Sequence, residues 1–322
     1  MLYPRVPELI TLRRERRLLS PPAEHYWWRS HAQLPTVLAL GQNCWRIFFA
    51  GRDAENRSHI LYADFDPTRD LKLTRLHSEP LLELGPPGSF DSAGMGPSAA
   101  LLVRNRIFLY YVGISLRQDV PYQQAIGLAI SDDGGASFRR AVPGPVLSVG
   151  PFDPYFTSIP HVSHIAGSFR MHYVSAFAWD RRHDRRDVRY HIKHARSADG
   201  IVWITEDRIA LGVSDEAEAA TARPWVIRRH DGWHMWFCCR GWRNTDGIPV
   251  PPYRLGYALS SDGVVWRRHN ELMRFENPPQ SGDWDSEMQA YPCVVPSCGE
   301  ILAFYNGNGF GRSGFGFARI LV

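Results

Sequence analysis

The feature that most constrains the fold of this chain is a short segment that occurs five times. Each copy is an apolar run around one proline: LPTVLAL (34–40), GPSAALLV (96–103), IPHVSHI (159–165), RPWVIRR (223–229) and YPCVVPS (291–297). The five prolines, at positions 35, 97, 160, 224 and 292, are separated by 62, 63, 64 and 68 residues. Self-similarity at a nearly constant period predicts a repeat architecture.

Each copy continues with two further β-rich runs. The second run is RIFFAGR (46–52), RIFLYYVG (106–113), FRMHYVSAF (169–177), WHMWFCCRG (233–241) or ILAFYNGNG (301–309). In copies two to four the third run ends in Ser-x-Asp-Gly, which is followed by Phe138, Trp203 or Trp266. Asp-Gly between alternating runs indicates a hairpin turn, because both residues tolerate a positive φ.

The repeats predict an all-β fold, a five-bladed β-propeller, since each contains three or four short strands and no segment shows sustained helical periodicity. We expect one domain over residues 1–322, with blades at 28–80, 89–145, 151–210, 216–275 and 284–322. The last repeat ends after its third strand. The segment PELITLRRE (7–15) is the candidate for the missing outer strand, which would close the ring.

Composition narrows the class of protein. The chain has 322 residues, 44% of them hydrophobic, and a net charge of only +4, which does not favour nucleic acid as a partner. No apolar run approaches the roughly 18–20 residues that span a bilayer, and the N-terminus lacks the apolar stretch of a signal peptide. The five cysteines form no disulfide pattern, so we expect reduced thiols and a cytoplasmic protein. The sequence predicts no oligomeric state.

Carboxylates recur ahead of the repeated prolines. In a propeller, the start of each innermost strand and the end of each second strand lie at one face, where pockets form. Six or seven positions before the proline lie Asp91, Asp153, Glu218 and Asp285, the last with Glu287 two residues later. The first copy has Trp28 and Arg29 there instead.

The same reasoning adds further residues to the expected site. At the ends of the second strands are Arg52, Asp53, Trp179, Arg240, Asn306 and Asn308, and along the first strands are Tyr155, Arg223 and Tyr291. Carboxylates and amides bind hydroxyl groups, aromatic rings stack on sugars, and arginines balance charge. The set therefore predicts a site for a polyhydroxylated ligand. As an alternative, any single acid could cap a turn or pair with a nearby arginine.

These residues resemble a known superfamily. FDS near 90, RPWV near 224, SSDGVVW near 261 and YNGNGFGRSGFGFA at 305–318 look like the arabinanases, levansucrases and invertases, the five-bladed propellers of glycoside hydrolase families 32, 43 and 68. More narrowly, the chain looks like uncharacterised bacterial relatives of those enzymes. The resemblance implies catalysis by Asp91 as base or nucleophile, Asp153 as orienting acid and Glu218 as general acid. In the known enzymes the first aspartate lies on the first blade, where this chain has Trp28 and Arg29.

Three functions follow from these observations. The first is a carbohydrate-active enzyme, a glycosidase or transglycosidase, that acts on a glycosidic bond of an intracellular or biosynthetic substrate by carboxylate acid–base catalysis. The second is a repurposed site that performs transfer or other non-hydrolytic chemistry on an anionic glycoconjugate or natural-product intermediate, held by Arg52, Arg223 and Arg240. The third is a sugar-binding propeller without chemistry.

No resident cofactor is expected. His191 and His194 are three residues apart on a predicted strand, as are His161 and His164, so the two members of each pair face opposite sides and do not predict a transition-metal site. A Ca²⁺ ion near the channel acids is the alternative, because oxygen ligands suit it. We expect a small molecule or oligosaccharide as partner, with an anionic one as an option, and neither nucleic acid nor membrane.

Overall fold

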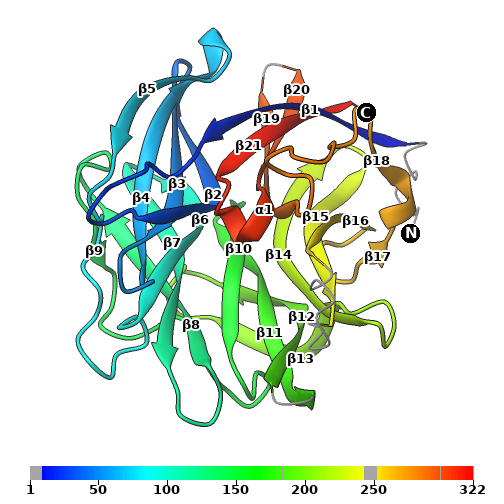
Figure 1. Cartoon of the computed structure of the whole chain (residues 1–322). Helices are drawn as coiled ribbons and strands as arrows, with labels where there is room; N and C mark the ends of the chain where they lie inside the picture. Colours follow the sequence, from blue (N-terminus) through cyan, green and yellow to red (C-terminus); the bar gives the residue numbers. More distant parts are fainter. Residues whose placement is uncertain (1–8, 183–184, 243–251, 298, 322) are drawn as a thin grey trace.

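The computed structural model describes residues 9–182, 185–242, 252–297 and 299–321, and their regular secondary structure is almost entirely β-strand. Helical geometry in the described residues is limited to the 3₁₀ turns η1 (Pro67–Arg69) and η2 (Asn270–Leu272) and the short α1 (Asn308–Gly311). In Figure 1 the strands follow one another in chain order around a common centre, close to which α1 lies. The prediction of an all-β fold is therefore confirmed.

Antiparallel four-stranded runs make up most of the described chain. They are, in order, β2 (Ser30–Gly41), β3 (Cys44–Arg52), β4 (Ser58–Asp66) and β5 (Lys72–His77); β6 (Gly94–Val103), β7 (Arg106–Leu116), β8 (Tyr122–Ser131) and β9 (Arg139–Arg140); β10 (Thr157–Ile165), β11 (Ser168–Arg182), β12 (Arg185–Ser197) and β13 (Ile204–Leu211); then β14 (Glu218–Arg229), β15 (Gly232–Gly241), β16 (Arg254–Ser260) and β17 (Arg267–Arg268). The first strand of each run lies innermost, because it carries the repeated proline toward the common centre.

The N-terminal segment completes the last run. This run contains β19 (Ala290–Ser297), β20 (Glu300–Asn306) and β21 (Phe315–Leu321), and β1 (Ile10–Leu19) pairs antiparallel with β21. The short β18 (Met273–Phe275) then adds in parallel to the other edge of β1. The expectation that the N-terminal segment supplies the outer strand is confirmed. The strand runs from Ile10 to Leu19 rather than over 7–15, and residues 7 and 8 lie outside the described residues.

Each repeated proline lies at an irregularity in its first strand. The strand register shifts across the proline in β2, β6, β10, β14 and β19. Leu34, Ile159, Arg223 and Tyr291, each directly before a proline, have φ between 37° and 60°. A proline has no N–H to donate to a strand ladder, so it is tolerated at a bulge. These bulges turn the proline carbonyls away from their own ladders and toward the centre.

The guanidinium of Arg223 fills the position to which these carbonyls point. Arg223 is fully buried and donates to Pro35 O at 3.0 Å, to Pro97 O and Pro292 O at 3.4 Å, and to Thr36 Oγ1 at 2.9 Å. Burial lowers its pKa to about 10, so the group stays charged at neutral pH. One side chain thus ties β14 to β2, β6 and β19 at the centre of the fold.

The Ser-x-Asp-Gly segments form turns, as predicted, and they also join neighbouring runs. Asp199 Oδ1 accepts hydrogen bonds from Ile201 N and Val202 N, and Gly200 has φ 78°. Gly200 O in turn accepts from Tyr110 Oη of the preceding run at 2.8 Å. The aromatic residue after each turn packs the same way: Trp203 lies edge-on to Tyr110, with ring centroids 6.1 Å apart.

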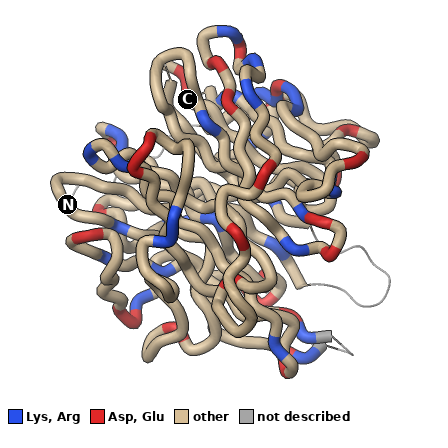
Figure 2. Tube along the Cα trace, turned by 90° about the vertical axis from the view of Figure 1, so that its left-hand side faces the viewer, with Lys and Arg blue, Asp and Glu red and all other residues tan. Residues whose placement is uncertain are grey.

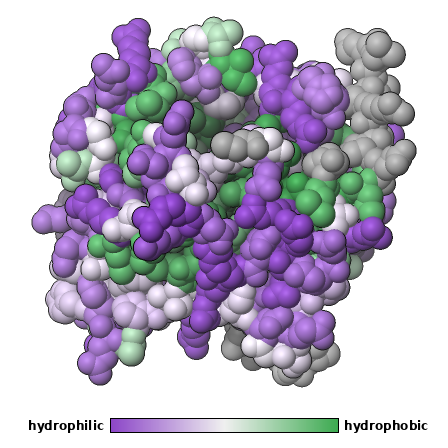
Figure 3. Space-filling view, turned by 90° about the horizontal axis from the view of Figure 1, so that it is seen from above, coloured by the Kyte–Doolittle hydropathy of each residue, from purple (hydrophilic) through white to green (hydrophobic). Residues whose placement is uncertain are grey.

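Charged, hydrophilic and hydrophobic residues are mixed on the two faces drawn in Figures 2 and 3. Acidic and basic residues are interspersed over the side drawn in Figure 2, and hydrophobic patches seen from above alternate with hydrophilic ones in Figure 3. None of the described helices is long and apolar enough to span a bilayer. Cys44, Cys238, Cys239 and Cys293 are free thiols, as predicted, and Cys298 lies outside the described residues.

Candidate functional site

Two adjoining cavities open where the first strands begin. One, of about 450 Å³, is lined among others by Leu34, Gly96, Ile159 and Tyr291, the residues that precede four of the repeated prolines. The other, of about 820 Å³, is lined by His31, Glu287, Arg312 and neighbouring residues. Arg52, Asn56 and Phe310 line both. We call the two together the axial cavity, because its walls come from strands on several sides of the common centre.

Four predicted site residues line the axial cavity: Arg52, Glu287, Tyr291 and Asn308. Arg52, at the end of β3, donates to Asn56 Oδ1 at 3.0 Å and to Gln33 Oε1 at 3.2 Å. Burial lowers the pKa of Arg52, and the charge of Arg312 lowers it further. Both hydrogen-bond partners are neutral amides, so the positive charge is oriented but not neutralised.

Residues that were not predicted complete the cavity. His31 is buried, and its Nδ1 lies 2.8 Å from Ser30 Oγ. Burial, and then the charges of Arg52 and Arg312, lower its pKa to about 4, so the ring is neutral at pH 7. Gln33 and Asn56 add amides. His31 and Gln33 lie two to four positions before Pro35, which is closer to the proline than the six or seven positions at which the predicted acids lie.

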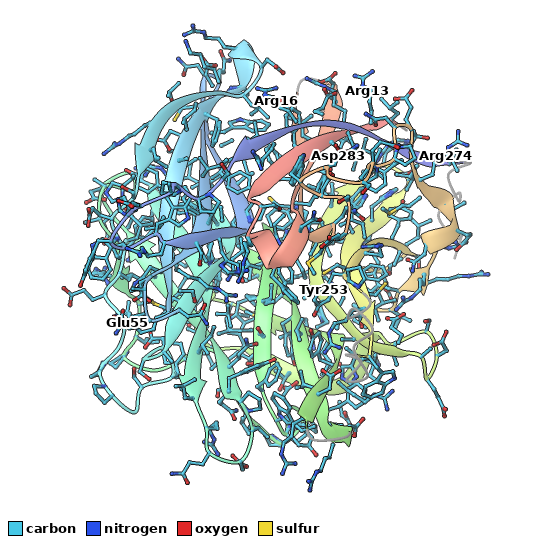
Figure 4. All side chains as sticks on the ribbon, viewed as in Figure 1. Arg13, Arg16, Glu55, Tyr253, Arg274 and Asp283 are labelled. Atoms are coloured by element: carbon cyan, nitrogen blue, oxygen red, sulfur yellow. The ribbon has the colours of Figure 1, made fainter. Side chains whose placement is uncertain are left out.

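Glycines bring Arg312 and Phe310 to the cavity. A Cβ at Gly311, which has φ 88°, would lie 2.6 Å from Ala32 O, so only glycine lets this loop approach β2 so closely. Phe310 packs against Tyr253, with centroids 6.1 Å apart, and Tyr253 packs against Tyr291 at 5.4 Å. Tyr253 is labelled near the centre of Figure 4. The segment YNGNGFGRSG is therefore a wall of the site.

Four of the predicted acids do not line the axial cavity: Asp91, Asp153, Glu218 and Asp285. Asp91, at 1% exposure, accepts from Tyr111 Oη at 3.0 Å and from Arg140 Nη2 at 2.7 Å. Asp285, at 0% exposure, accepts in the same way from Tyr305 Oη at 2.7 Å and Arg14 Nη2 at 2.6 Å. In each case the tyrosine comes from the second strand of the same run and the arginine from its outermost strand.

Asp153 and Glu218 each share one part of this arrangement, the tyrosine for Asp153 and the arginine for Glu218. Asp153 accepts from Tyr173 Oη at 3.0 and 3.1 Å, with Lys193 Nζ 3.8 Å away. Glu218 forms a two-point pair with Arg268, at 2.8 and 3.0 Å. Each carboxylate therefore has its own buried partners and holds the loop before its first strand onto the run. The expected convergence of these acids on one mouth is not what the structure shows, and their catalytic roles stay predictions.

Two arginines expected at the mouth lie elsewhere. Arg223 is the buried link between the proline carbonyls. Arg240, 2% exposed, forms a two-point pair with Asp187 at 2.9 and 3.1 Å and donates to Val188 O. Both were expected to bind an anionic substrate. Since their N–H groups face acceptors inside the fold, that expectation was wrong for these two residues.

The remaining predicted residues support neighbouring structure. Asp53 accepts from Arg57 Nε and His59 Nε2, both at 2.9 Å. Trp179 packs against Tyr122 and Phe156. Tyr155 O accepts a hydrogen bond from Gln123, Asn306 Oδ1 accepts from Leu34 N at 3.1 Å, and Asn308 Oδ1 accepts from Glu287 N at 2.8 Å. Among the described residues, no group of three or more His, Cys, Asp or Glu side chains could hold a metal ion.

Acid should destabilise the protein through its buried histidines. Burial lowers the pKa of His161 to about 3 and those of His31, His191 and His194 to about 4, against about 6.5 in an unfolded chain. Between these values the unfolded state binds more protons, so the free energy of unfolding falls as the pH is lowered from about 6.5 toward 4. Urea unfolding at several pH values would measure this. The His31→Gln variant should show a shallower slope, and a pH-independent midpoint over this interval would contradict the prediction.

No family model matches the sequence. The uncharacterized protein Rv1502 of Mycobacterium tuberculosis is 36% identical over 302 residues, which cover 94% of this chain and 96% of that protein, and MT1551 from a second strain matches equally well.

The fold is that of glycoside hydrolase propellers. A glycosyl hydrolase from Bacteroides ovatus has a TM-score of 0.69 at 14% identity, covering 98% of this chain and 96% of that one. A thermostable family-43 glycoside hydrolase has a TM-score of 0.61 at 15% identity, covering 92% and 89%. The family 32 β-fructofuranosidase BmSUC1 of Bombyx mori has a TM-score of 0.63 at 13% identity, covering 97% of this chain and 61% of that one. At these identities the likeness shows the fold alone.

Proposed function

Because the chain belongs to the same protein family as Rv1502 of Mycobacterium tuberculosis and has the fold of glycoside hydrolases, we propose that it is a carbohydrate-active protein that binds a sugar-containing ligand in the axial cavity. The observation that carries this proposal is the cavity itself, in which Arg52, Asn56 and Phe310 join two lobes. We also propose that the antiparallel runs are the blades of a single five-bladed propeller, with β1 as the outer strand of the last blade.

The lining has the groups that a sugar requires. Amides of Gln33, Asn56 and Gln124 can donate to and accept from hydroxyl groups, and the rings of Tyr291 and Phe310 offer faces for the C–H side of a pyranose or furanose. These side chains come from three runs: the first, the second and the last. A sugar of one or two rings therefore contacts several strands at once, which favours a specific orientation in the cavity.

The carboxylates favour binding or non-hydrolytic chemistry over acid–base hydrolysis. Hydrolysis of a glycoside by this chemistry uses two carboxyl groups on either side of the bond. In the described lining of the axial cavity, Glu287 is the one carboxylate. The second candidate is hydrolysis by Asp91, Asp153 and Glu218, which the likeness to glycoside hydrolases favours. This second function requires those three side chains to leave their present partners.

The Phe310→Ala variant tests the proposed site. We expect at least one member of a panel of mono- and oligosaccharides to bind the wild type. Phe310→Ala should weaken that binding on the order of 10-fold, because loss of one stacking contact with an aromatic side chain costs about 1–3 kcal/mol. Isothermal titration calorimetry measures the affinity. Phe152→Ala is the matched control, since Phe152 is 41% exposed and lies outside the cavity lining.

Two results would count against the proposal. Sugar affinity that is equal in Phe310→Ala and wild type would place the ligand elsewhere. Turnover of glycosides by the wild type that is abolished in Glu218→Gln, with folding and binding retained, would favour the second candidate.

A further inference from the structure

Arg52, which is partly buried, and Arg312, which is exposed, both line the axial cavity without an ion pair to a carboxylate. Four other arginines that are at least partly buried pair with carboxylates: Arg46 with Asp64, Arg140 with Asp91, Arg240 with Asp187 and Arg268 with Glu218. Arg52 has only amide partners, and the Arg312 side chain has no hydrogen bond or ion pair with a described residue. Two guanidinium groups therefore share one cavity, and neither forms an ion pair with a described carboxylate.

The fold holds these two charges close together. Arg312 is near enough to lower the pKa of Arg52, and both lower that of His31. Two like charges beside a half-buried cavity are unfavourable unless a ligand neutralises them. The amides of Gln33 and Asn56 orient the Arg52 guanidinium, and the close approach at Gly311 brings the next residue, Arg312, beside β2. The geometry is therefore preorganised for an anion.

Glu287 adds a second point of recognition. It lines the same lobe as the two arginines but forms no ion pair with either of them. Asn308 Oδ1 accepts from Glu287 N and Arg254 donates to Glu287 O, so the backbone is anchored while the carboxylate stays available. A carboxylate in this place accepts hydrogen bonds from hydroxyl groups. The lobe thus matches a ligand that has an anionic end and a hydroxylated part.

We propose that the ligand of the axial cavity is a phosphorylated sugar, with its phosphate between Arg52 and Arg312 and a hydroxyl group on Glu287. Two guanidinium groups match the two charges and several oxygens of a phosphate monoester better than the single charge of a carboxylate. The sugar part of this assignment rests on the proposed function, whereas the phosphate part rests on the two arginines alone.

Inorganic phosphate tests the anion site without knowledge of the sugar. At constant ionic strength we expect phosphate to bind one site of the wild-type protein, as followed by NMR shifts of backbone amides around residues 31, 52 and 312. The Arg312→Met variant should bind it on the order of 10-fold more weakly, since a hydrogen bond to a charged group is lost. This variant should fold normally because Arg312 is exposed and has no partner among the described residues. Arg117→Met, an exposed arginine outside the lining, is the control and should leave the affinity unchanged.

The outcomes separate this proposal from the proposed function. No site for phosphate, or equal affinity in wild type and Arg312→Met, overturns the anion site. Acetate that binds as tightly as phosphate, with the same dependence on Arg312, overturns the choice of phosphate. If neutral sugars bind in a Phe310-dependent manner while phosphate does not, the sugar site stands and this inference fails. If phosphate binds as expected while no sugar of the panel does, the proposed function fails and the anion site stands.

Discussion

Replacing Arg223 with methionine should lower the free energy of unfolding by about 3–5 kcal/mol. The substitution keeps most of the apolar stem but leaves Pro35 O, Pro97 O, Pro292 O and Thr36 Oγ1 without their donor in a fully buried place. Each buried acceptor left without a donor costs about 1–3 kcal/mol. Removal of the buried charge gains less than this, because the same carbonyls already stabilise the guanidinium in the native protein. Chemical denaturation with a fluorescence or circular dichroism readout measures the difference.

Arg228→Met is the matched control for this prediction. Arg228 lies on the same strand, β14, but is exposed, so its replacement should change stability by no more than about 0.5 kcal/mol. Equal stability of Arg223→Met and Arg228→Met would contradict this prediction. It would mean that the hydrogen bonds of Arg223 to the other first strands contribute little to the stability of the fold.

Replacing Asp285 with asparagine should cost about 3 kcal/mol, because it breaks a buried ion pair and leaves Arg14 with only the partly exposed Asp283 as a counter-charge. Asp285 is fully buried, and its partner Arg14 is the residue of β1 that reaches into the last run. The variant should also lose protection of residues 10–19 from proteolysis, since Arg14 attaches this strand by its side chain as well as by its ladder. Urea unfolding and limited trypsin digestion measure the two effects.

Asp283 provides the control for Asp285. It accepts from the same Arg14 Nη2 at 3.0 Å, but its side chain is 38% exposed, whereas that of Asp285 is fully buried (Figure 4 labels Asp283). Asp283→Asn should therefore change stability little, because water and salt screen the exposed pair. Equal losses in the two variants would mean that burial does not set the strength of the pairing.

The periodicity of the sequence predicts the arrangement of the strands well. The repeated proline run marks the first strand of each run, and the unfinished last repeat correctly indicated that the N-terminal segment adds the outer strand. These features are readable because they depend on local chemistry. Proline needs a bulge, Asp-Gly needs a turn, and an apolar run needs a covered face.

The site was harder to predict because its polar residues are chosen by long-range pairing. Asp91 and Glu218 have the spacing of catalytic acids, yet Arg140 and Arg268, 49 and 50 residues later, bind them. No local pattern in the sequence predicts that these two arginines form ion pairs with the acids. In contrast, Arg52 lies at the end of a second strand, as predicted, and it lines the axial cavity. Arg312 was missed because the glycine-rich loop that places it follows no repeat period.

The link made by Arg223 also determines how a ligand can move. Its guanidinium binds the carbonyls one residue beyond Leu34, Gly96 and Tyr291, which line the axial cavity. The passage along the centre is therefore blocked just behind the binding residues. For the proposed ligand we therefore expect entry and exit by the same opening, so that a free molecule or the terminal unit of a chain, and not the middle of a polysaccharide, reaches the innermost contacts.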